Sequence, residues 1–448
     1  MDAPSRTIGK HPAGLAILAA TELAERFSYY GMTALLSLFM VKQLLLPGHA
    51  EHVLGLAALR HLFEFRGPMS DLAFASLTYG WYGGLVYFTP ILGGWIADRW
   101  LGKKLTVTAG ALLMSAGHVA MSFDQTFLIA LLLLILGSGA LKGNIAAQVG
   151  KLYPESSESL RERGFTIFST AINIGAVAGP LGTGTVSAIY GFHAGFAVAA
   201  VLMLIALGVY LAGSRLLPDQ RPTRASAASL APLTREEKVR TWWLVGVIAL
   251  MIPVSVTYTM IWNIGVIWVD QHVDLGSPLG TVPASWFNSI DSFASIVVAP
   301  FLIGIWAAQA RRRKEPAAMT KIAIGAAITG VSGFLLTLGS LTAADGRVSV
   351  IWPLLAWFGM GAGFMWYWPI ALSLVSKAAP AKVSATLMGG SYLTLFFGSA
   401  IMGWIGSFYD QMSNAAFWAL DGAIALASAF VILALKRPVS RILELCED

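Results

Sequence analysis

One apolar run near the N-terminus carries charges where a membrane helix would have none, at Glu22, Glu25 and Arg26. Helical spacings of three and four residues place these side chains on one face, which continues through Tyr29 and Tyr30. Each unpaired charge at the centre of a bilayer costs about 3 kcal/mol. The polar face must therefore point to a water-filled cavity or to a partner rather than to lipid, which predicts a bundle of several membrane helices.

The composition supports this prediction, since 56% of the residues are hydrophobic and only 12% are charged. Apolar segments of about 20 residues, the length that spans a bilayer, recur along the whole chain. We therefore expect an all-α polytopic membrane protein. The single cysteine, Cys446, cannot form an internal disulfide, and the N-terminal run lacks a cleavage signature, so no leader peptide is expected.

Twelve membrane spans fit the sequence. Their expected bounds are 12–40, 72–97, 105–123, 127–152, 165–190, 192–213, 241–268, 286–310, 320–341, 349–376, 385–407 and 415–435. A stretch rich in Pro, Ser, Ala and charge separates the sixth span from the seventh. The predicted organisation is an N-terminal six-helix bundle over 1–214, a cytoplasmic linker over 215–240 and a C-terminal six-helix bundle over 241–448.

The basic residues are distributed unequally between the two sides of this topology. All but six of the 30 Lys and Arg fall on the N-terminal side of the membrane. The exceptions are Lys42, Arg60, Arg66 and Arg347 on the other side, with Arg26 and Lys142 inside spans. The positive-inside rule then places both termini in the cytoplasm. It also explains the net charge of +6 without a nucleic-acid partner.

The two halves repeat weakly. Pro90–Ala97, at the end of the second span, matches Pro300–Ala307, at the end of the eighth. Gly137–Ala140 in the fourth span matches Gly359–Ala362 in the tenth. Matches six spans apart indicate halves related by an axis along the membrane normal, as in the major facilitator superfamily, where cargo binds at mid-membrane between the halves.

The segment Gly94–Lys104 resembles the loop motif of that superfamily. In that resemblance the glycines allow a tight turn, and Asp98 and Arg99 form a conformational latch between helix ends. The alternative is an ordinary solvated turn.

The pattern Glu22-x-x-Glu25-Arg26-Phe27-x-Tyr29-Tyr30-Gly31 resembles the first-helix signature of the proton-dependent oligopeptide transporters, the POT or PTR peptide transporter family. Leu141–Asn144, which contains Lys142, and Phe168–Gly175, which contains Asn173, resemble its fourth-helix and fifth-helix patterns. The resemblance covers nearly the whole chain and implies a divergent bacterial-type member. It implies proton coupling by Glu22, Glu25, Arg26 and Lys142. As a second buried basic group, Lys142 needs a negative partner, and we expect Glu22 or Glu25 to be that partner. A carboxylate that shares a cavity with two basic groups can bind a proton, break its ion pair and release the proton on the other side. The alternative is that these charges only hold helices together.

The chain departs from the family in its C-terminal half. Phe364 stands where the family has a glutamate that holds a peptide's amino terminus, and Ser255 and Thr259 stand where a tryptophan and a second glutamate are expected. Aromatic residues crowd this region, which favours a larger, less cationic or more apolar cargo than a free dipeptide. Two acids are new. Asp291 could bind a proton or a cargo donor, whereas Asp421 is expected at the outer edge of its span, in contact with water.

The sequence thus predicts a proton-coupled symporter that imports a peptide-like or modified small organic compound across the inner (plasma) membrane by alternating access. The expected cargo-binding residues are Arg26, Tyr29, Tyr30, Tyr82, Asn173, Asn288, Asp291 and Phe364. The expected partners are the cargo, protons and lipid, with no cofactor beyond the proton gradient, and the protein is expected to be a monomer. No enzyme motif is present and no metal site is expected, although His49, His52 and His61 lie in one outer loop. Two alternatives remain: an ordinary di- or tripeptide symporter, and a non-transporting receptor on the same scaffold.

Overall fold

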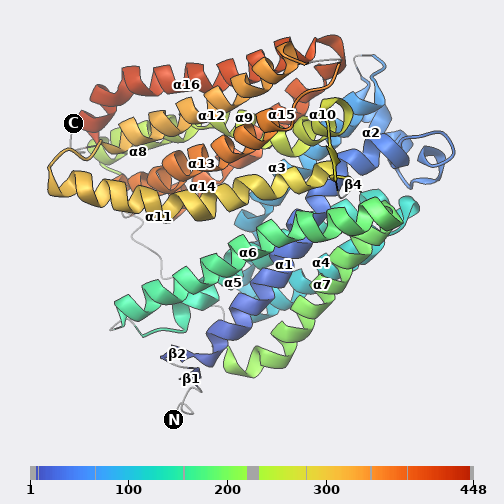
Figure 1. The fold of residues 1–448 in the computed structure, drawn as a ribbon. Helices are drawn as coiled ribbons and strands as arrows, with labels where there is room; N and C mark the ends of the chain where they lie inside the picture. The colour runs from blue at the N-terminus through green and yellow to red at the C-terminus, as the bar shows by residue number, and fades with distance from the viewer. Residues whose placement is uncertain are drawn as a thin grey trace. The chain divides into compact units, whose positions relative to one another are not determined.

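The structure is a computed structural model, and it describes residues 7–8, 10–65, 67–154, 157–218, 232–278, 280–343, 346–380 and 382–443. The described residues are mostly helical (Figure 1). They form two compact units, the first from Met1–Asp71 and Leu85–Ser226 and the second from Leu72–Gly84 and Ala227–Asp448. Cys446 and residues 219–231, half of the expected linker, lie outside the described residues.

The elements of the first part of the chain begin with a short strand pair and continue as long helices. They are β1 (Thr7–Ile8), β2 (His11–Pro12), α1 (Ala13–Phe39), η1 (Met40–Leu44), η2 (Ala50–His52), α2 (Leu56–Phe63), α3 (Asp71–Ile96), η3 (Ala97–Leu101), α4 (Lys103–Ala120), η4 (Asp124–Thr126), α5 (Phe127–Lys151), α6 (Glu158–Tyr190), α7 (Phe192–Gly213) and η5 (Ser214–Leu216). The strands pair antiparallel, with Thr7 opposite Pro12.

The elements that follow the linker are again mostly helices. They are α8 (Arg235–Leu250), α9 (Ile252–Met260), η6 (Ile261–Gly265), α10 (Val266–His272), β3 (Gly276–Ser277), β4 (Gly280–Thr281), η7 (Ala284–Ser289), α11 (Ile290–Arg311), α12 (Ala318–Leu341), α13 (Ile351–Ala378), α14 (Ser384–Ser391), α15 (Leu393–Gly406), η8 (Tyr409–Gln411) and α16 (Asn414–Ile442). The β3–β4 pair is antiparallel.

Each expected membrane span corresponds to one helix or to a run of consecutive helices. Within the described residues, nine helices or runs are long and apolar enough to cross a membrane. The remaining three are α1, α3 and α4, which carry more polar residues and glycine. The all-α fold predicted from the sequence is confirmed.

In the first unit, α1 packs against α6 and α7, and α4 packs against α5 and α7 (Figure 1). Glycine allows α1 and α6 to approach closely. A Cβ atom added to Gly179 would lie 2.5 Å from the backbone oxygen of Phe27, and one added to Gly31 would lie 2.5 Å from Thr183. Small residues at such a contact let two backbones pack directly, which stabilises helix pairs in membranes.

In the second unit, α12 packs against α13 and α16, and α11 packs against α13.

The seventh span is not one regular helix. It is interrupted at Met251, just before the proline at position 253, and again by the π-helical segment η6. The eleventh span is likewise divided at Tyr392. Helix α9 is therefore a short segment with an irregular backbone at both ends.

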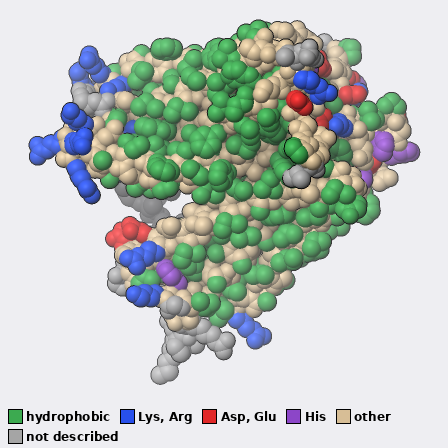
Figure 2. Space-filling model, viewed as in Figure 1, with side chains coloured by type: hydrophobic (Ala, Val, Ile, Leu, Met, Phe, Trp, Pro, Cys, Tyr) green, Lys and Arg blue, Asp and Glu red, His purple; other side chains and the backbone are tan. Residues whose placement is uncertain are grey.

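The surface is consistent with a lipid environment. Figure 2 shows hydrophobic side chains covering the sides of the long helices, with Lys and Arg gathered at the end where α11 gives way to α12. Phe301, Ile303 and Phe430 are about two-thirds exposed, and Arg311, Arg312, Arg313 and Lys314 are exposed at the helix end. Between the first two spans, Leu56–Phe63 forms the short helix α2.

Candidate functional site

The polar face of α1 forms the centre of the candidate site in the first unit. Glu22, Glu25 and Arg26 are all buried, with exposures of 4%, 0% and 6%. Arg26 Nε lies 3.2 Å from Glu22 Oε1 and donates a hydrogen bond to Glu25. One guanidinium therefore holds two carboxylates in a dry environment, where attraction between charges is strong.

This arrangement leaves hydrogen-bonding capacity unused. Within the described residues, one oxygen of Glu22, one oxygen of Glu25 and the Nη2 of Arg26 are buried without a hydrogen-bond partner. Helix α6 closes over this face, since a Cβ atom added to Gly175 would lie 2.8 Å from the Cβ of Arg26. The unused atoms can bind a proton or a small polar group.

Lys142, on α5, faces the same region but pairs differently from the sequence-based expectation. Its Nζ lies 4.1 Å from the ring centre of Tyr29 and 5.0 Å from that of Tyr87. In the part of the chain that the structure describes, it forms no ion pair with Glu22 or Glu25. The ammonium group is held by aromatic faces, a favourable contact when water is excluded.

Tyr29 and Tyr30, two of the expected cargo residues, lie beside these charges. The Arg26 guanidinium carbon is 5.4 Å from the ring centre of Tyr29, and the rings of Tyr29 and Tyr30 meet edge to face at 5.2 Å. Asn173 lies on α6, partly buried, two residues before Gly175.

The second unit contains a separate polar centre at Asp291, on α11. The residue is 1% exposed, and its Oδ2 accepts a hydrogen bond of 2.8 Å from the hydroxyl of Tyr258, on α9. Ser292 makes a longer contact of 3.4 Å with Oδ1. No Lys or Arg of the described residues forms an ion pair with Asp291, so neutral donors hold this carboxyl group.

Aromatic rings continue from Tyr258 along α13. Phe364 stacks on Tyr258 with ring centres 4.9 Å apart and an interplanar angle of 24°. Trp368 lies beyond it at 6.1 Å and 21°. Trp366 takes no part in this row, because it packs edge to face on Trp306. The row places an apolar surface next to the Asp291 carboxyl group.

The remaining expected cargo residues are also buried. Asn288 accepts a hydrogen bond of 3.1 Å from Trp357 through Oδ1, while its amide nitrogen is buried without a partner among the described residues. Tyr82 lies on α3 within the second unit and is 3% exposed.

Asp421 corrects an expectation. It was expected at the outer edge of the last span in contact with water, but it is 1% exposed inside α16. The expectation was wrong because span boundaries in the sequence do not determine which helices pack around a given turn.

The turn after α3 has the expected glycine. Gly102 has a φ of 74°, a conformation that other residues rarely adopt. Asp98 lies 4.0 Å from Lys103 and is largely exposed, and Arg99 lies over the ring of Trp95 at 6.0 Å.

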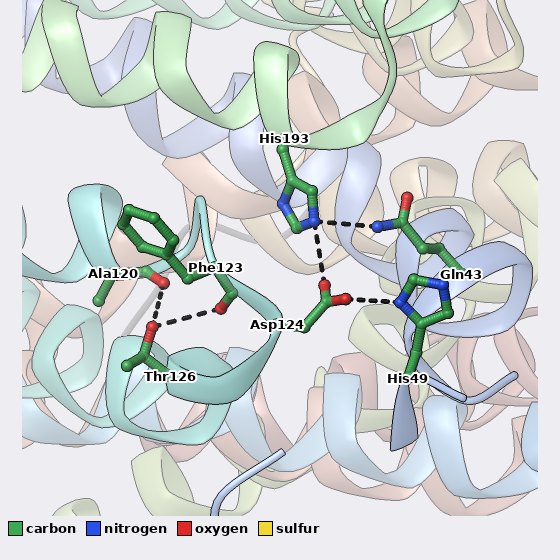
Figure 3. Close-up of polar contacts among 7 residues, drawn as sticks. All are labelled: Gln43, His49, Ala120, Phe123, Asp124, Thr126 and His193. Carbon is green, nitrogen blue, oxygen red and sulfur yellow. Dashed lines mark hydrogen bonds and ion pairs between the residues drawn. The ribbon is translucent and has the colours of Figure 1, made fainter. Parts of the chain in front are cut away.

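A further polar cluster joins the segment after α1, the segment before α5 and the first turn of α7, and it was not predicted (Figure 3). Asp124 lies 2.7 Å from His49 Nδ1 and 3.1 Å from His193 Nε2, and the same His193 nitrogen lies 2.9 Å from the Gln43 amide nitrogen. Among the described residues, no group of three His, Cys, Asp or Glu side chains has the geometry of a metal site. The sequence carries no sign of this cluster, because its members are far apart along the chain.

Comparison with known proteins agrees with the sequence-based assignment. The family model PTR2, described as the POT family, matches residues 104–232 and 227–421. The chain is 27% identical to the uncharacterized transporter YclF of Bacillus subtilis (strain 168), over 98% of this chain and 96% of that protein. It is also 27% identical to the di-/tripeptide transporter of Lactococcus lactis subsp. cremoris, over 98% of both chains.

Solved structures give the same result. A crystal structure of a peptide transporter POT in complex with alafosfalin resembles this structure with a TM-score of 0.86 and 26% identity, over 98% of this chain and 97% of that one. The predicted resemblance and the major facilitator fold are confirmed. The chain is therefore a membrane transporter rather than an enzyme, and it belongs to the POT family.

Proposed function

We propose that this protein is a proton-coupled symporter that imports a peptide-like or modified small organic compound by alternating access. The proton gradient is its driving force, and it needs no cofactor. It works as a monomer in the inner membrane with both termini in the cytoplasm. Its halves are 1–214 and 241–448, joined by the linker 215–240, and Asp98 and Arg99 form the latch at the turn after α3.

The observation that carries the proposal is the buried group of Glu22, Glu25 and Arg26. Two carboxylates compete for one guanidinium in a site closed to water. When one carboxylate binds a proton, its attraction to Arg26 falls and the guanidinium becomes available for another anion. Lys142 and Arg26 both contact the ring of Tyr29, so the Lys142 ammonium group lies close to the group whose charge changes. Proton binding and anion binding are thereby coupled.

The cargo follows from the same residues. Arg26 can bind a carboxylate through its planar fork of donors, with Tyr29, Tyr30 and Asn173 beside it. In the second unit, Asp291 and Asn288 offer hydrogen bonds, while Phe364 offers an apolar face, and Tyr82 completes the expected set. The name of the Lactococcus relative, a di-/tripeptide transporter, and the alafosfalin bound to the similar crystal structure support a peptide-like cargo. The row of rings favours compounds with an apolar or aromatic group.

One observation favours a second candidate, an ordinary di- or tripeptide symporter. Asp291 is buried with neutral donors only, so it can accept a peptide's ammonium group in place of the family's missing glutamate. A receptor without transport is disfavoured, because a receptor has no need of the buried charges on α1.

The test has two steps on the purified full-length protein. Thermal unfolding is first measured with di- and tripeptides, with their N-acetylated forms and with alafosfalin, since a ligand at 100 times its Kd stabilises the folded state by about 2.7 kcal/mol. Uptake of the stabilising compounds into liposomes is then measured with and without an inward proton gradient. Stabilisation by free dipeptides favours the ordinary symporter, whereas stabilisation by blocked or aromatic compounds alone favours the modified cargo. Uptake that does not respond to the proton gradient contradicts the proposed function.

A further inference from the structure

Asp421 is a buried acid that the proposed coupling group does not include. It lies in the second turn of α16 and is 1% exposed. Neither of its carboxylate oxygens has a partner with full hydrogen-bond geometry among the described residues. The hydroxyl of Thr257, on α9, donates to the backbone oxygen of Asp421 over 2.7 Å and is also close enough to interact with the carboxyl group. This carboxyl group is therefore enclosed with only weak compensation from a neutral donor.

The elements around Asp421 bring no charged partner to it. On α12, Gly330 packs so closely that a Cβ atom there would lie 2.8 Å from the backbone oxygen of Gly422. The only charged residue of α12 is Lys321, nine residues before Gly330 and about 13 Å along the helix. Helix α9 has no charged residue and contributes Tyr258 as its only titratable group.

The other neighbouring elements carry their charges at their far ends or in solvent. These charged residues are Arg235, Glu236, Glu237, Lys238 and Arg240 at the start of α8, Asp410 on η8, and Lys436, Arg437 and Arg441 at the end of α16. Tyr409 of η8 packs against Phe417 as a neutral ring. Helix α10 packs Trp268 against Trp418 and carries Asp270 and His272 further on, both partly exposed. Lys436 is 15 residues, or about 22 Å, from Asp421 along α16. An ionised carboxylate in such a site loses its hydration without gaining a charged partner, so the neutral acid is the form that fits this packing.

Asp421 and Asp291 are linked through neighbouring residues of one short helix. Thr257 contacts Asp421, and the next residue, Tyr258, contacts Asp291. Helix α9 has nine residues and an irregular backbone at each end. A change in its packing against α16 would thus also move the Tyr258 hydroxyl that holds Asp291.

We propose that Asp421 is a proton-binding positioning residue of the transport cycle. It packs as the neutral acid in the conformation described here, and loss of its proton changes the packing of α9 and the contact between Tyr258 and Asp291. This inference rests on the proposed function, because it adds a second proton site to a proton-driven cycle. Asp421 does not need to touch the cargo.

The test compares the wild type with Asp421→Asn, which keeps the size of the neutral acid but cannot lose a proton. Ser428→Ala is the matched control, since Ser428 is a buried polar residue of the same helix whose hydroxyl binds the backbone oxygen of Leu250 over 2.6 Å. Liposomes containing each protein are given dialanine or alafosfalin. Uptake driven by a proton gradient and gradient-free exchange are both measured across a range of external pH.

We expect Asp421→Asn to keep gradient-free exchange within about twofold of the wild type and to lose proton-driven accumulation by about tenfold, with a flattened pH profile. Ser428→Ala should retain the wild-type profile. In infrared spectra, the carbonyl-stretch absorption of protonated carboxylic acids should contain a component in the wild type that is missing in Asp421→Asn. If Asp421→Asn does not fold, Asp421→Glu takes its place and should shift that band and the pH profile of uptake.

Failure of the proposed function and failure of the inference on Asp421 give different results. A wild type that accumulates neither dialanine nor alafosfalin in response to the gradient defeats the proposed function, and this inference with it. A coupled wild type whose Asp421→Asn variant has the same accumulation and pH profile defeats the inference alone. An infrared spectrum without an acid band from Asp421 defeats it as well.

Discussion

Tyr258 donates a hydrogen bond of 2.8 Å to the carboxyl group of Asp291, and the two residues lie on different helices, α9 and α11. The ring of Tyr258 also stacks on Phe364 of α13. One side chain therefore connects three helices of the second unit and couples an acid to an aromatic surface.

Removing this hydroxyl tests its role. Tyr258→Phe keeps the stacked ring but leaves Asp291 without its short hydrogen bond, so we expect a loss of about 1–3 kcal/mol in the free energy of unfolding.

Asp291→Asn should change the uptake rate and its pH optimum if the acid binds a proton or a cargo ammonium group. Ser292→Ala, which removes only the 3.4 Å contact, is the control for both variants. Unchanged uptake and pH optimum in Asp291→Asn would exclude Asp291 from the site.

The carboxylates of α1 give a second prediction. Glu22→Gln and Glu25→Gln should each reduce proton-driven uptake by about tenfold or more while retaining exchange, because the amide cannot take up a proton. Parallel uptake assays with and without a pH gradient measure this. Full proton-driven uptake in both variants would contradict the coupling assignment.

The position of Lys142 predicts a dependence on aromatic rings. Tyr87→Phe keeps a ring below the ammonium group, whereas Tyr87→Leu removes it. We expect Tyr87→Leu to be less stable than Tyr87→Phe by about 1–2 kcal/mol, the size of a buried contact between a cation and a ring. Chemical denaturation measures the stability difference between Tyr87→Leu and Tyr87→Phe twice, once with Lys142 present and once in proteins that also carry Lys142→Met. The stability difference should be smaller in the proteins without Lys142. An equal difference would show that the ring acts only through packing.

Phe364 is expected to determine cargo choice. Phe364→Glu places an acid at the position where the family resemblance leads us to expect one. We predict that it raises the affinity for free dipeptides relative to N-acetylated dipeptides by about tenfold, since a charge-assisted hydrogen bond contributes about 1.5–3 kcal/mol. Phe364→Leu, which is apolar but lacks the ring, is the control. Thermal shift titrations with dialanine and N-acetyl-dialanine measure the ratio, and a ratio unchanged from the wild type would remove Phe364 from the site.

The cluster in Figure 3 predicts that Asp124 stabilises the first unit. Its carboxyl group contacts both His49 and His193. We expect Asp124→Asn to lower the free energy of unfolding by about 1 kcal/mol, because the amide replaces one of the two acceptor oxygens by a donor. Thermal melting curves of the wild type and the variant give the comparison, and equal melting temperatures would contradict a stabilising role.

Local spacing was sufficient to predict part of this structure. The contacts among Glu22, Glu25 and Arg26 follow from helical periodicity, because the residues are neighbours on one helix. The break before α9 has a local cause in the proline at position 253, but the seventh span was expected as one continuous segment. Hydropathy likewise predicted a helix or run of helices for every expected span.

Contacts between distant segments could not be obtained in this way. The sequence indicated that Lys142 needs a negative partner, but the ammonium group lies over Tyr29 and Tyr87, which is a result of how α1, α3 and α5 pack. The burial of Asp421 depends on the glycines of α12, about 90 residues earlier in the chain. The meeting of His49, Asp124 and His193 depends on two separate connections and on the first turn of α7.

The π-helical turn at Ile261–Gly265 places a constraint on how this chain can change. A π turn holds one residue more than an α turn, and each residue of a regular helix rotates the side chain after it by about 100°. Because the extra residue is held within the wider turn, deleting one residue from η6 would restore a regular helix and leave α10, including the fully buried Trp268, close to its present orientation. The same deletion in a regular helix would rotate every later side chain by about 100°. The seventh span should therefore tolerate the loss of one residue at this turn better than the loss of one residue from a regular helical stretch.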